Sequence, residues 1–281
     1  MIKTKLGLDR ILTISLPRRQ DRKEKFNQRF GKMEFNYIEA ISGMDISIPK
    51  LISEGIVNNE FYDAFGAINK NVIACSLSHL KCWEIFQASK TETCLIFEDD
   101  VVSTQEIFSS TTNSDNEVVI QPSNFWNDMM SQLEDVVFLG KKEKYVDGID
   151  RTPLFCTPFW SAGLFGAHSY MINKKSVDKI INGYKPLKYP ADVYLDVLIE
   201  DLNVYALKES LFRQETDIYL HDKPNLKKVD SDTFHNENRK KGFTNVKVDN
   251  IVESVEFINY PESLEFDDKR WPPLIKAKLR S

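Results

Sequence analysis

The sequence predicts an α/β fold with a mostly parallel central sheet, and two patterns support that prediction. Short apolar segments alternate with amphipathic ones between residues 10 and 207, the order that gives a sheet covered by helices. One apolar segment, Thr93–Phe97, is nearly continuous, as expected of a strand buried on both faces. A chain of 281 residues can therefore form one large α/β domain with a smaller appendage.

The first elements follow directly from this pattern. Arg10–Leu16 is expected to form a strand, Gln20–Phe30 a charged helix, and Glu34–Ile38 a second short strand. Asn71–Ala88 is expected to form a helix, because its apolar side chains recur at spacings of three, four and seven. The residues on that face are Val72, Cys75, His79, Cys82, Trp83 and Phe86.

The later elements continue the alternation. Further strands are expected at Asp135–Gly140, Gly163–Ile172 and Asn203–Leu207. A helix over Lys174–Ile181 is expected to end at Gly183, because glycine is favoured just after the last helical turn. Another helix is expected to begin at Pro190, with Asp192 in its first turn, where a carboxylate is favourable.

A domain boundary is expected near residue 220. Residues 1–220 carry the alternating pattern, whereas residues 221–281 are polar and interrupted by prolines. We interpret the second segment as a C-terminal extension that packs on the domain or is partly flexible. Its lysine-rich stretch, 223–241, and its acidic stretch, 249–268, are typical of solvated surface.

Composition limits the class of protein. Hydrophobic residues make up 42% and charged residues 28% of the chain, as in ordinary globular proteins. A net charge of -5 gives no support to a nucleic-acid partner. No segment resembles a signal peptide or a membrane span, which leaves peripheral membrane association open. The four cysteines form no CxxC pair and are expected to be reduced, which favours a cytoplasmic location.

The acidic triplet Glu98–Asp99–Asp100 follows the most apolar strand. Ligands of open α/β sheets bind at the carboxyl ends of the strands. Clustered carboxylates raise one another's pKa unless a cation neutralises them, and hard oxygen ligands select Mg²⁺ or Mn²⁺. The triplet therefore predicts a metal–diphosphate site, unless it merely ends the strand and caps the next element. Strand alternation would point Glu98 and Asp100 the same way and Asp99 the other way.

Seven segments together resemble glycosyltransferase family 25, the group of bacterial lipooligosaccharide galactosyltransferases and procollagen galactosyltransferases. They occur in the family's order and cover residues from about 10 to 218. The matching segments are Ile14–Arg22, Tyr37–Gly43, Ile73–His79 followed by Trp83, Leu95–Val101, Asp135–Gly140, Gly166–Ile172 and Pro190–Leu195.

The resemblance implies a GT-A type, Rossmann-like glycosyltransferase fold and a nucleotide-sugar donor. UDP-galactose is the usual donor of the family, and UDP-glucose is the alternative. A divalent ion, Mn²⁺ or Mg²⁺, inversion at the anomeric carbon, and a glycan or hydroxylated protein acceptor are also implied. Two other interpretations are a catalytically inactive relative that binds a nucleotide sugar or glycan, and a metal-dependent nucleotidyltransferase. The second lacks a GxxxxGK-type loop in this sequence.

The triplet supplies the expected metal ligands. We expect Asp100 and Glu98 to bind the ion and Asp99 to contact the donor, with one of the three acting only as a cap. His221, four residues after Asp217, is expected to complete the metal shell.

Asp192 is the expected general base for the acceptor hydroxyl, because it matches the family's Pro-x-Asp and opens a helix. Its alternative role is an ordinary N-terminal cap. Asp217 is the second candidate for the base.

The expected donor-binding residues are Leu16, Arg22, Ser78, Asp99 and Gly163. Arginine makes forked bonds to phosphate, but we expect Arg18 and Arg19 to be solvated. His79 lies on the apolar face of its helix and is expected to be a buried, hydrogen-bonded structural residue.

Overall fold

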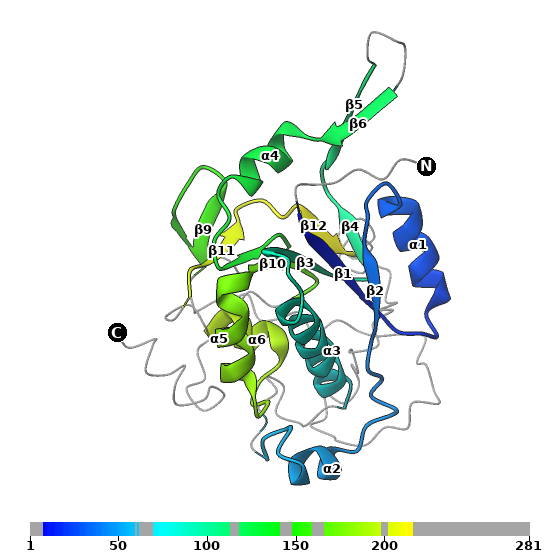
Figure 1. Cartoon of the computed structure of the whole chain (residues 1–281), viewed down its shortest axis with the longest axis vertical. Coiled ribbons are helices and arrows are strands. Elements are labelled where there is room, and N and C mark those ends of the chain that lie inside the picture. Colours follow the sequence, from blue (N-terminus) through cyan, green and yellow to red (C-terminus); the bar gives the residue numbers. More distant parts are fainter. Residues whose placement is uncertain are drawn as a thin grey trace, which may run out of the picture.

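A central sheet of eight strands organises the computed structural model, which describes residues 8–59, 61, 70–112, 118–140, 148–158, 166–197 and 202–215. The strands are β1 (Arg10–Ser15), β2 (Asn36–Glu39), β3 (Thr93–Glu98), β7 (Val136–Phe138), β8 (Gly148–Asp150), β9 (Phe155–Pro158), β10 (Ser169–Asn173) and β11 (Val204–Leu207). Their order is β2-β1-β3-β10-β7-β11-β9-β8 (Figure 1). Six of these strands point the same way, and β10 and β9 run opposite to them. The predicted α/β fold with a mostly parallel sheet is confirmed, and it is consistent with a Rossmann-like glycosyltransferase fold.

Helices cover both faces of the sheet (Figure 1). They are α1 (Gln20–Phe30), α2 (Ile48–Ser53), α3 (Lys70–Gln87), α4 (Asn124–Met130), α5 (Lys174–Tyr184) and α6 (Ala191–Val197). Helices α3, α5 and α6 pack on one face, and α1 and α4 on the other.

Two small sheets complete the described fold. β4 (Val101–Ser103) pairs with β12 (Phe212–Gln214), while β5 (Phe108–Thr112) and β6 (Val118–Pro122) form a hairpin. The hairpin projects from the top of Figure 1.

Side-chain alternation along the strands builds two cores. In β3, Cys94 and Ile96 contribute to one core, and Leu95 and Phe97 to the other. We call the first the α3 core, because Trp83 of α3 packs there with Tyr170 and Tyr184. The second is the phenylalanine core, built around Phe26, Phe30, Phe97 and Phe212. The prediction that β3 is buried on both faces is confirmed.

The boundary predicted for α5 is wrong. The helix continues through Gly183 to Tyr184, so Gly183 does not follow its last turn. A Cβ atom at Gly183 would lie 2.5 Å from the Tyr194 hydroxyl oxygen. The residue is small because Tyr194 approaches the helix there. The strand expected over Gly163–Ile172 also differs, since β10 begins only at Ser169 within the described residues.

The sequence predicts no element between residues 101 and 135, yet β4, β5, β6 and α4 lie there. The β5 segment, Phe-Ser-Ser-Thr-Thr, has no apolar alternation that would mark it as a strand. The extension expected over residues 221–281 lies outside the described residues.

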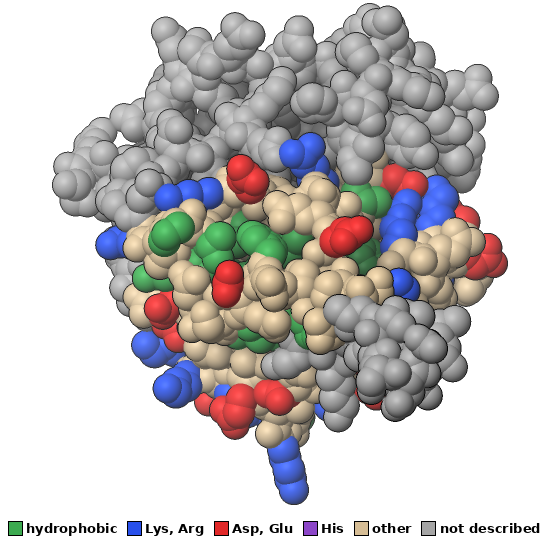
Figure 2. Space-filling model, turned by 90° about the horizontal axis from the view of Figure 1, so that it is seen from above, with side chains coloured by type: hydrophobic (Ala, Val, Ile, Leu, Met, Phe, Trp, Pro, Cys, Tyr) green, Lys and Arg blue, Asp and Glu red, His purple; other side chains and the backbone are tan. Residues whose placement is uncertain are grey.

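Three further features concern helix hydropathy, the cysteines and the surface charge. Within the part of the chain that the structure describes, no helix combines the length and hydropathy that crossing a bilayer requires. All four cysteines are free thiols, as expected. On the face drawn in Figure 2, acidic and basic side chains of the described residues are interspersed rather than separated by sign.

Candidate active site

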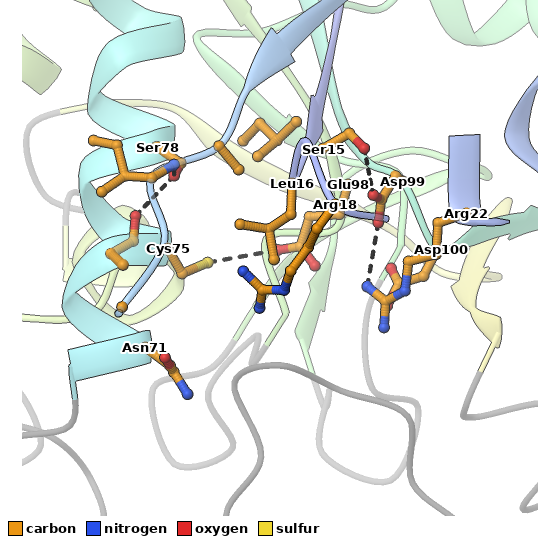
Figure 3. A pocket seen from close by; sticks show the side chains of 15 residues that line it. Ser15, Leu16, Arg18, Arg22, Asn71, Cys75, Ser78, Glu98, Asp99 and Asp100 are labelled. Atoms are coloured by element: carbon orange, nitrogen blue, oxygen red, sulfur yellow. Dashed lines mark hydrogen bonds and ion pairs between the residues drawn. The ribbon is translucent and has the colours of Figure 1, made fainter. Parts of the chain in front are cut away.

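A cleft opens where β1 and β3 end (Figure 3). Its walls come from the β1–α1 loop, the loop after β2, the first half of α3, and the turn after β3. Glu98, Asp99 and Asp100 all line it. The structure therefore brings the acidic triplet to the sheet edge at which ligands of this fold class bind.

Asp99 is held from two sides. Ser15 Oγ donates a hydrogen bond of 2.7 Å to Asp99 Oδ2, and Arg22 Nη1 lies 3.2 Å from Asp99 Oδ1. The same Arg22 nitrogen lies 3.5 Å from Asp100 Oδ2. Burial raises the pKa of Asp99, although Arg22 and Ser15 favour its ionised form. Arg22 Nη1 thus lies within 3.5 Å of both buried carboxylates.

Glu98 faces the opposite way, toward α3. His79 Nε2 lies 3.4 Å from Glu98 Oε1, and Gln214 Nε2 donates to Oε2 at 3.2 Å. Burial alone would raise the pKa of Glu98, but the hydrogen bond with His79 and the neighbouring His79, His168 and Arg22 side chains outweigh it, so that the pKa falls below its ordinary value. Glu98 is therefore an anchored, ionised carboxylate.

The predicted orientation of the triplet is wrong. Strand alternation pairs Glu98 with Asp100, but in the structure Asp99 and Asp100 both approach Arg22. The reason is that β3 ends at Glu98, and the next two residues form a turn. Strand alternation does not extend into a turn.

A second group of potential ligands lies beside the cleft. Among the described residues, Cys75, His79 and Glu98 bring ligand atoms within 4.8 Å of one another. Burial raises the pKa of the Cys75 thiol well above its usual value, and the carboxylates of Glu98, Asp192 and Asp100 add to the shift. The thiolate is the ligand form of cysteine, and thiolates suit softer metals than Mn²⁺ or Mg²⁺. The carboxylate oxygens of the turn are the better donors for a hard cation.

The arginines of the β1–α1 loop differ in position. Arg19 pairs with Asp21 at 2.9 Å and does not line the cleft. Its side chain is only 14% exposed, so the expectation that Arg19 is solvated is wrong. Arg18 is exposed, as expected, but it lines the cleft and donates to Ser42 Oγ at 3.1 Å. Figure 3 shows it between α3 and the acidic turn. Sequence reasoning missed this placement, because nothing in the local pattern distinguishes Arg18 from Arg19.

Ser78 and Leu16, both expected near the donor, line the cleft. The Ser78 hydroxyl accepts a 2.8 Å bond from the Ile41 amide and donates a 2.8 Å bond to the Ala74 carbonyl. Ser78 therefore holds the loop after β2 against α3. Opposite it, a Cβ atom at Gly43 would lie 2.0 Å from Asn71 Oδ1, so this end of the cleft is closely packed.

Asp192 lies in the first turn of α6, as predicted. Its Oδ2 accepts a 3.0 Å bond from the Gly166 amide, and its Oδ1 accepts a 2.9 Å bond from the Val193 amide. Glu98 N donates to His168 O at 2.9 Å, so the chain from Gly166 enters β10 beside the acidic turn. Asp192 lies one residue inside α6 and bonds to the next amide and to a distant loop amide, so its carboxylate ties the start of α6 to the chain before β10 rather than capping the helix. Its role as base stays a prediction.

Three predicted residues, Gly163, Asp217 and His221, lie outside the described residues. Two described residues were missed altogether: Gln214, which bonds to Glu98, and Tyr170, which bonds to His79 at 2.9 Å. Tyr170 sits in an apolar strand, where only tertiary contacts reveal a polar role. The expectation that His79 is buried is confirmed, since its side chain is 0% exposed.

Comparisons with known proteins show the family of this chain. A family model described as "Glycosyltransferase family 25 (LPS biosynthesis protein)" matches residues 8–195. A Drosophila melanogaster protein named "Glycosyltransferase 25 family member" is 33% identical over 104 residues, which are 35% of this chain and 17% of that protein.

Two further relatives carry more specific names. "Procollagen galactosyltransferase 1-A" of Xenopus laevis is 22% identical over 211 residues, 70% of this chain and 32% of that protein. A human protein named "Inactive glycosyltransferase 25 family member 3" is 30% identical over 103 residues, 35% of this chain and 17% of that protein. The matched part is thus a third or less of each relative's length.

Proposed function

Because this chain belongs to glycosyltransferase family 25, we propose that it transfers a hexose, galactose or glucose, from a UDP-sugar to a hydroxyl group of a glycan or protein acceptor. The observation that carries the proposal is the cleft at the ends of β1 and β3, with three carboxylates on one wall and Arg18 at its rim. A nucleotide diphosphate needs both a cation and hydrogen-bond donors at such a place.

The carboxylate turn suits a divalent ion. Asp99 and Asp100 both lie near Arg22, and Glu98 adds a third carboxylate, whose pKa is lowered. The clustered carboxylate oxygens are the donors that Mn²⁺ and Mg²⁺ prefer. We propose that Asp100 and Glu98 hold the ion, with His221 as a further candidate, while Asp99 keeps Ser15 and Arg22 in place. Bound there, the ion would neutralise the diphosphate and stabilise the departing UDP.

The donor's nucleotide is proposed to lie along the β1–α1 loop. Leu16 gives this wall an apolar surface, and Arg18 reaches the cleft from the same loop. Arg22 pairs with Asp99 and Asp100, and we propose that Arg18, which also lines the cleft, meets phosphate oxygens directly. Arg22 then acts on the donor through the carboxylates that it orients. Gly163 remains a proposed contact to the donor sugar.

Asp192 is the proposed base. Inverting transfer requires a carboxylate within about 3 Å of the acceptor hydroxyl. The Gly166 and Val193 amides hold the Asp192 carboxylate in one orientation, and the chain through Gly166 fixes it near the edge of the sheet where Glu98 lies. A carboxylate has about four lone-pair sites, so the two amide bonds leave room for a hydroxyl donor.

A donor screen tests the proposal. UDP-galactose, UDP-glucose, UDP-N-acetylglucosamine and GDP-sugars are each incubated with and without Mn²⁺, and nucleotide release is followed. We expect metal-dependent UDP release from a UDP-hexose, abolished in Asp100→Ala and greatly slowed in Asp192→Asn. The matched control is Asp178→Asn, which changes a carboxylate on α5 that bonds to Gln87 far from the acidic turn. Wild-type rates in Asp100→Ala would remove the metal assignment, and wild-type rates in Asp192→Asn would remove the base.

The alternative function is a binding protein without turnover. The human relative named inactive motivates it. Donor binding by calorimetry in saturating Mn²⁺, with no UDP release over hours in the presence of candidate acceptors, would favour this alternative.

A further inference from the structure

A chain of hydrogen bonds runs from the α3 core to Glu98. Trp83 Nε1 donates to Tyr170 Oη at 2.8 Å, and Tyr170 Oη lies 2.9 Å from His79 Nδ1. His79 Nε2 then lies 3.4 Å from Glu98 Oε1. The side chains of Trp83, Tyr170 and His79 are each 0% exposed. Water therefore does not compete for these bonds.

The direction of the chain follows from what each group can do. An indole N–H only donates, so Tyr170 Oη accepts from Trp83. The hydroxyl hydrogen of Tyr170 is then available to His79 Nδ1. A neutral imidazole that accepts at Nδ1 carries its hydrogen on Nε2, which faces Glu98. This assignment gives every polar hydrogen of the three side chains an acceptor.

We propose that Tyr170 is a positioning residue that acts through His79 to fix the Glu98 carboxylate for a divalent ion. The inference rests on the proposed function, in which Glu98 is a metal ligand. Gln214 holds the other oxygen of Glu98 at 3.2 Å. The carboxylate is thus bonded from two sides, and it lines the cleft.

Hydrogen-bond partners of a metal ligand matter because they already hold its side chain in place. Metal binding then has less conformational freedom to remove. Losing a hydrogen-bond partner of a metal ligand commonly weakens metal binding by about 10- to 100-fold. Tyr170 bonds to His79 rather than to the ligand itself, and Gln214 still holds one oxygen of Glu98, so we expect the lower end, about 10-fold, when Tyr170 loses its hydroxyl.

The test is Mn²⁺ affinity of the full chain without donor, measured by the electron paramagnetic resonance signal of free Mn²⁺. Tyr170→Phe keeps the ring and removes the hydroxyl. Tyr184→Phe is the matched control, because it removes a buried hydroxyl from the same core whose bond goes to the Tyr189 carbonyl at 3.0 Å. We expect binding about 10-fold weaker in Tyr170→Phe and unchanged in Tyr184→Phe.

A second pair of variants covers the case in which Tyr170→Phe does not fold. His79→Gln keeps a side-chain N–H for Glu98, and His79→Leu does not. We expect Mn²⁺ affinity nearer to wild type in His79→Gln than in His79→Leu. Equal affinities in that pair would overturn the inference.

The remaining outcomes separate this inference from the function. Wild-type binding of Mn²⁺ that is unchanged in a folded Tyr170→Phe overturns the positioning role alone. Equal weakening in both tyrosine variants also overturns it, because the effect would then be general loosening of the core. Absence of Mn²⁺ binding by the wild-type chain overturns the metal assignment and this inference together.

Discussion

The two cores on either side of the sheet are packed by different means. In the phenylalanine core the rings contact one another directly: Phe30 stacks on Phe97 with centroids 5.7 Å apart, and Phe212 meets Phe97 edge-on at 4.8 Å. In the α3 core the large side chains also carry polar atoms, and Trp83, Tyr170 and His79 are joined by hydrogen bonds.

The difference shows which of the two cores holds polar groups in defined positions. Phe97 and Glu98 are adjacent at the end of β3, yet the first belongs to the phenylalanine core and the second is bonded from the α3 side. The aromatic rings of the phenylalanine core need only fit together in shape. The buried donors and acceptors of the α3 core must in addition form hydrogen bonds. Four substitutions test this contrast, in order of expected size.

Phe97→Ala should have the largest effect on stability. Phe97 is 0% exposed and contacts three rings of its core, so its removal should lower the free energy of unfolding by about 3–5 kcal/mol. Urea unfolding measures the loss. In conditions where the variant is folded, Mn²⁺ affinity should stay close to wild type. A loss below about 1 kcal/mol would show that the rings repack freely.

Arg22→Met should come next, at about 3 kcal/mol at neutral pH, because it leaves Asp99 buried without its cation. The folded-state pKa of Asp99 is already above its ordinary 3.8, and losing Arg22 should raise it further. A carboxyl with a raised pKa destabilises the fold when it is ionised. The loss in the free energy of unfolding should therefore be absent below pH 3.8 and should grow as the pH rises through the pKa that Asp99 has in the folded state.

Urea unfolding of wild type and Arg22→Met between pH 5 and pH 8, with metal chelated, measures this dependence. Arg29→Met is the matched control, since Arg29 lies on the same helix and pairs with Glu215 at 2.9 Å in a more exposed place. A deficit that shrinks with rising pH would contradict the account of Asp99.

Gly183→Ala should cost about 1 kcal/mol, although alanine normally favours a helix interior by up to about 1 kcal/mol. The added methyl group would press on the Tyr194 hydroxyl, which donates to the Ile180 carbonyl at 2.9 Å. Asn182→Ala, exposed in the same turn, should be neutral or slightly stabilising. Thermal unfolding compares the two, and a stabilised Gly183→Ala would show that Tyr194 moves aside at no cost.

Asp21→Asn should have the smallest effect. The hydrogen bond from Arg19 lowers the pKa of Asp21 to about 2, but the Asp21 side chain is 55% exposed, so solvent screens the pair and it should contribute less than about 0.5 kcal/mol. With a depressed pKa, this contribution is present above 3.8 and is lost as the pH falls toward 2. Urea unfolding at pH 7 and at pH 2.5 checks both statements. A loss of more than about 1 kcal/mol in the free energy of unfolding would show that this ion pair contributes as much as a buried pair does.

Local pattern was sufficient for much of the fold. α1 runs from Gln20 to Phe30 as predicted, and β3 extends one residue past its expected end. These segments have clear periodicity, and their burial agrees with it. The β5–β6 hairpin and β12 could not be predicted, because β5 is polar and β12 is only three residues long.

The site was predictable only in outline. The rule that ligands lie at strand ends correctly brings Glu98, Asp99 and Asp100 to a cleft. The partners of those carboxylates are set by tertiary contacts, which local spacing does not encode. Tyr170 and Gln214 lie far along the chain from Glu98, and no local signal links them to it.

The reversed direction of β10 has a consequence for how this edge is built. If every strand of the sheet ended at the cleft, only the loops that follow strands would line it. The loops that lead into strands would lie at the opposite edge of the sheet. β10 instead begins at the edge where its neighbours β3 and β7 end. The backbone from Gly166 (φ +120°) therefore leads into β10 beside the acidic turn. Asp192 accepts a hydrogen bond from the Gly166 amide. The start of α6 is therefore linked to the end of β3 through this short segment, and a shift of one would displace the other.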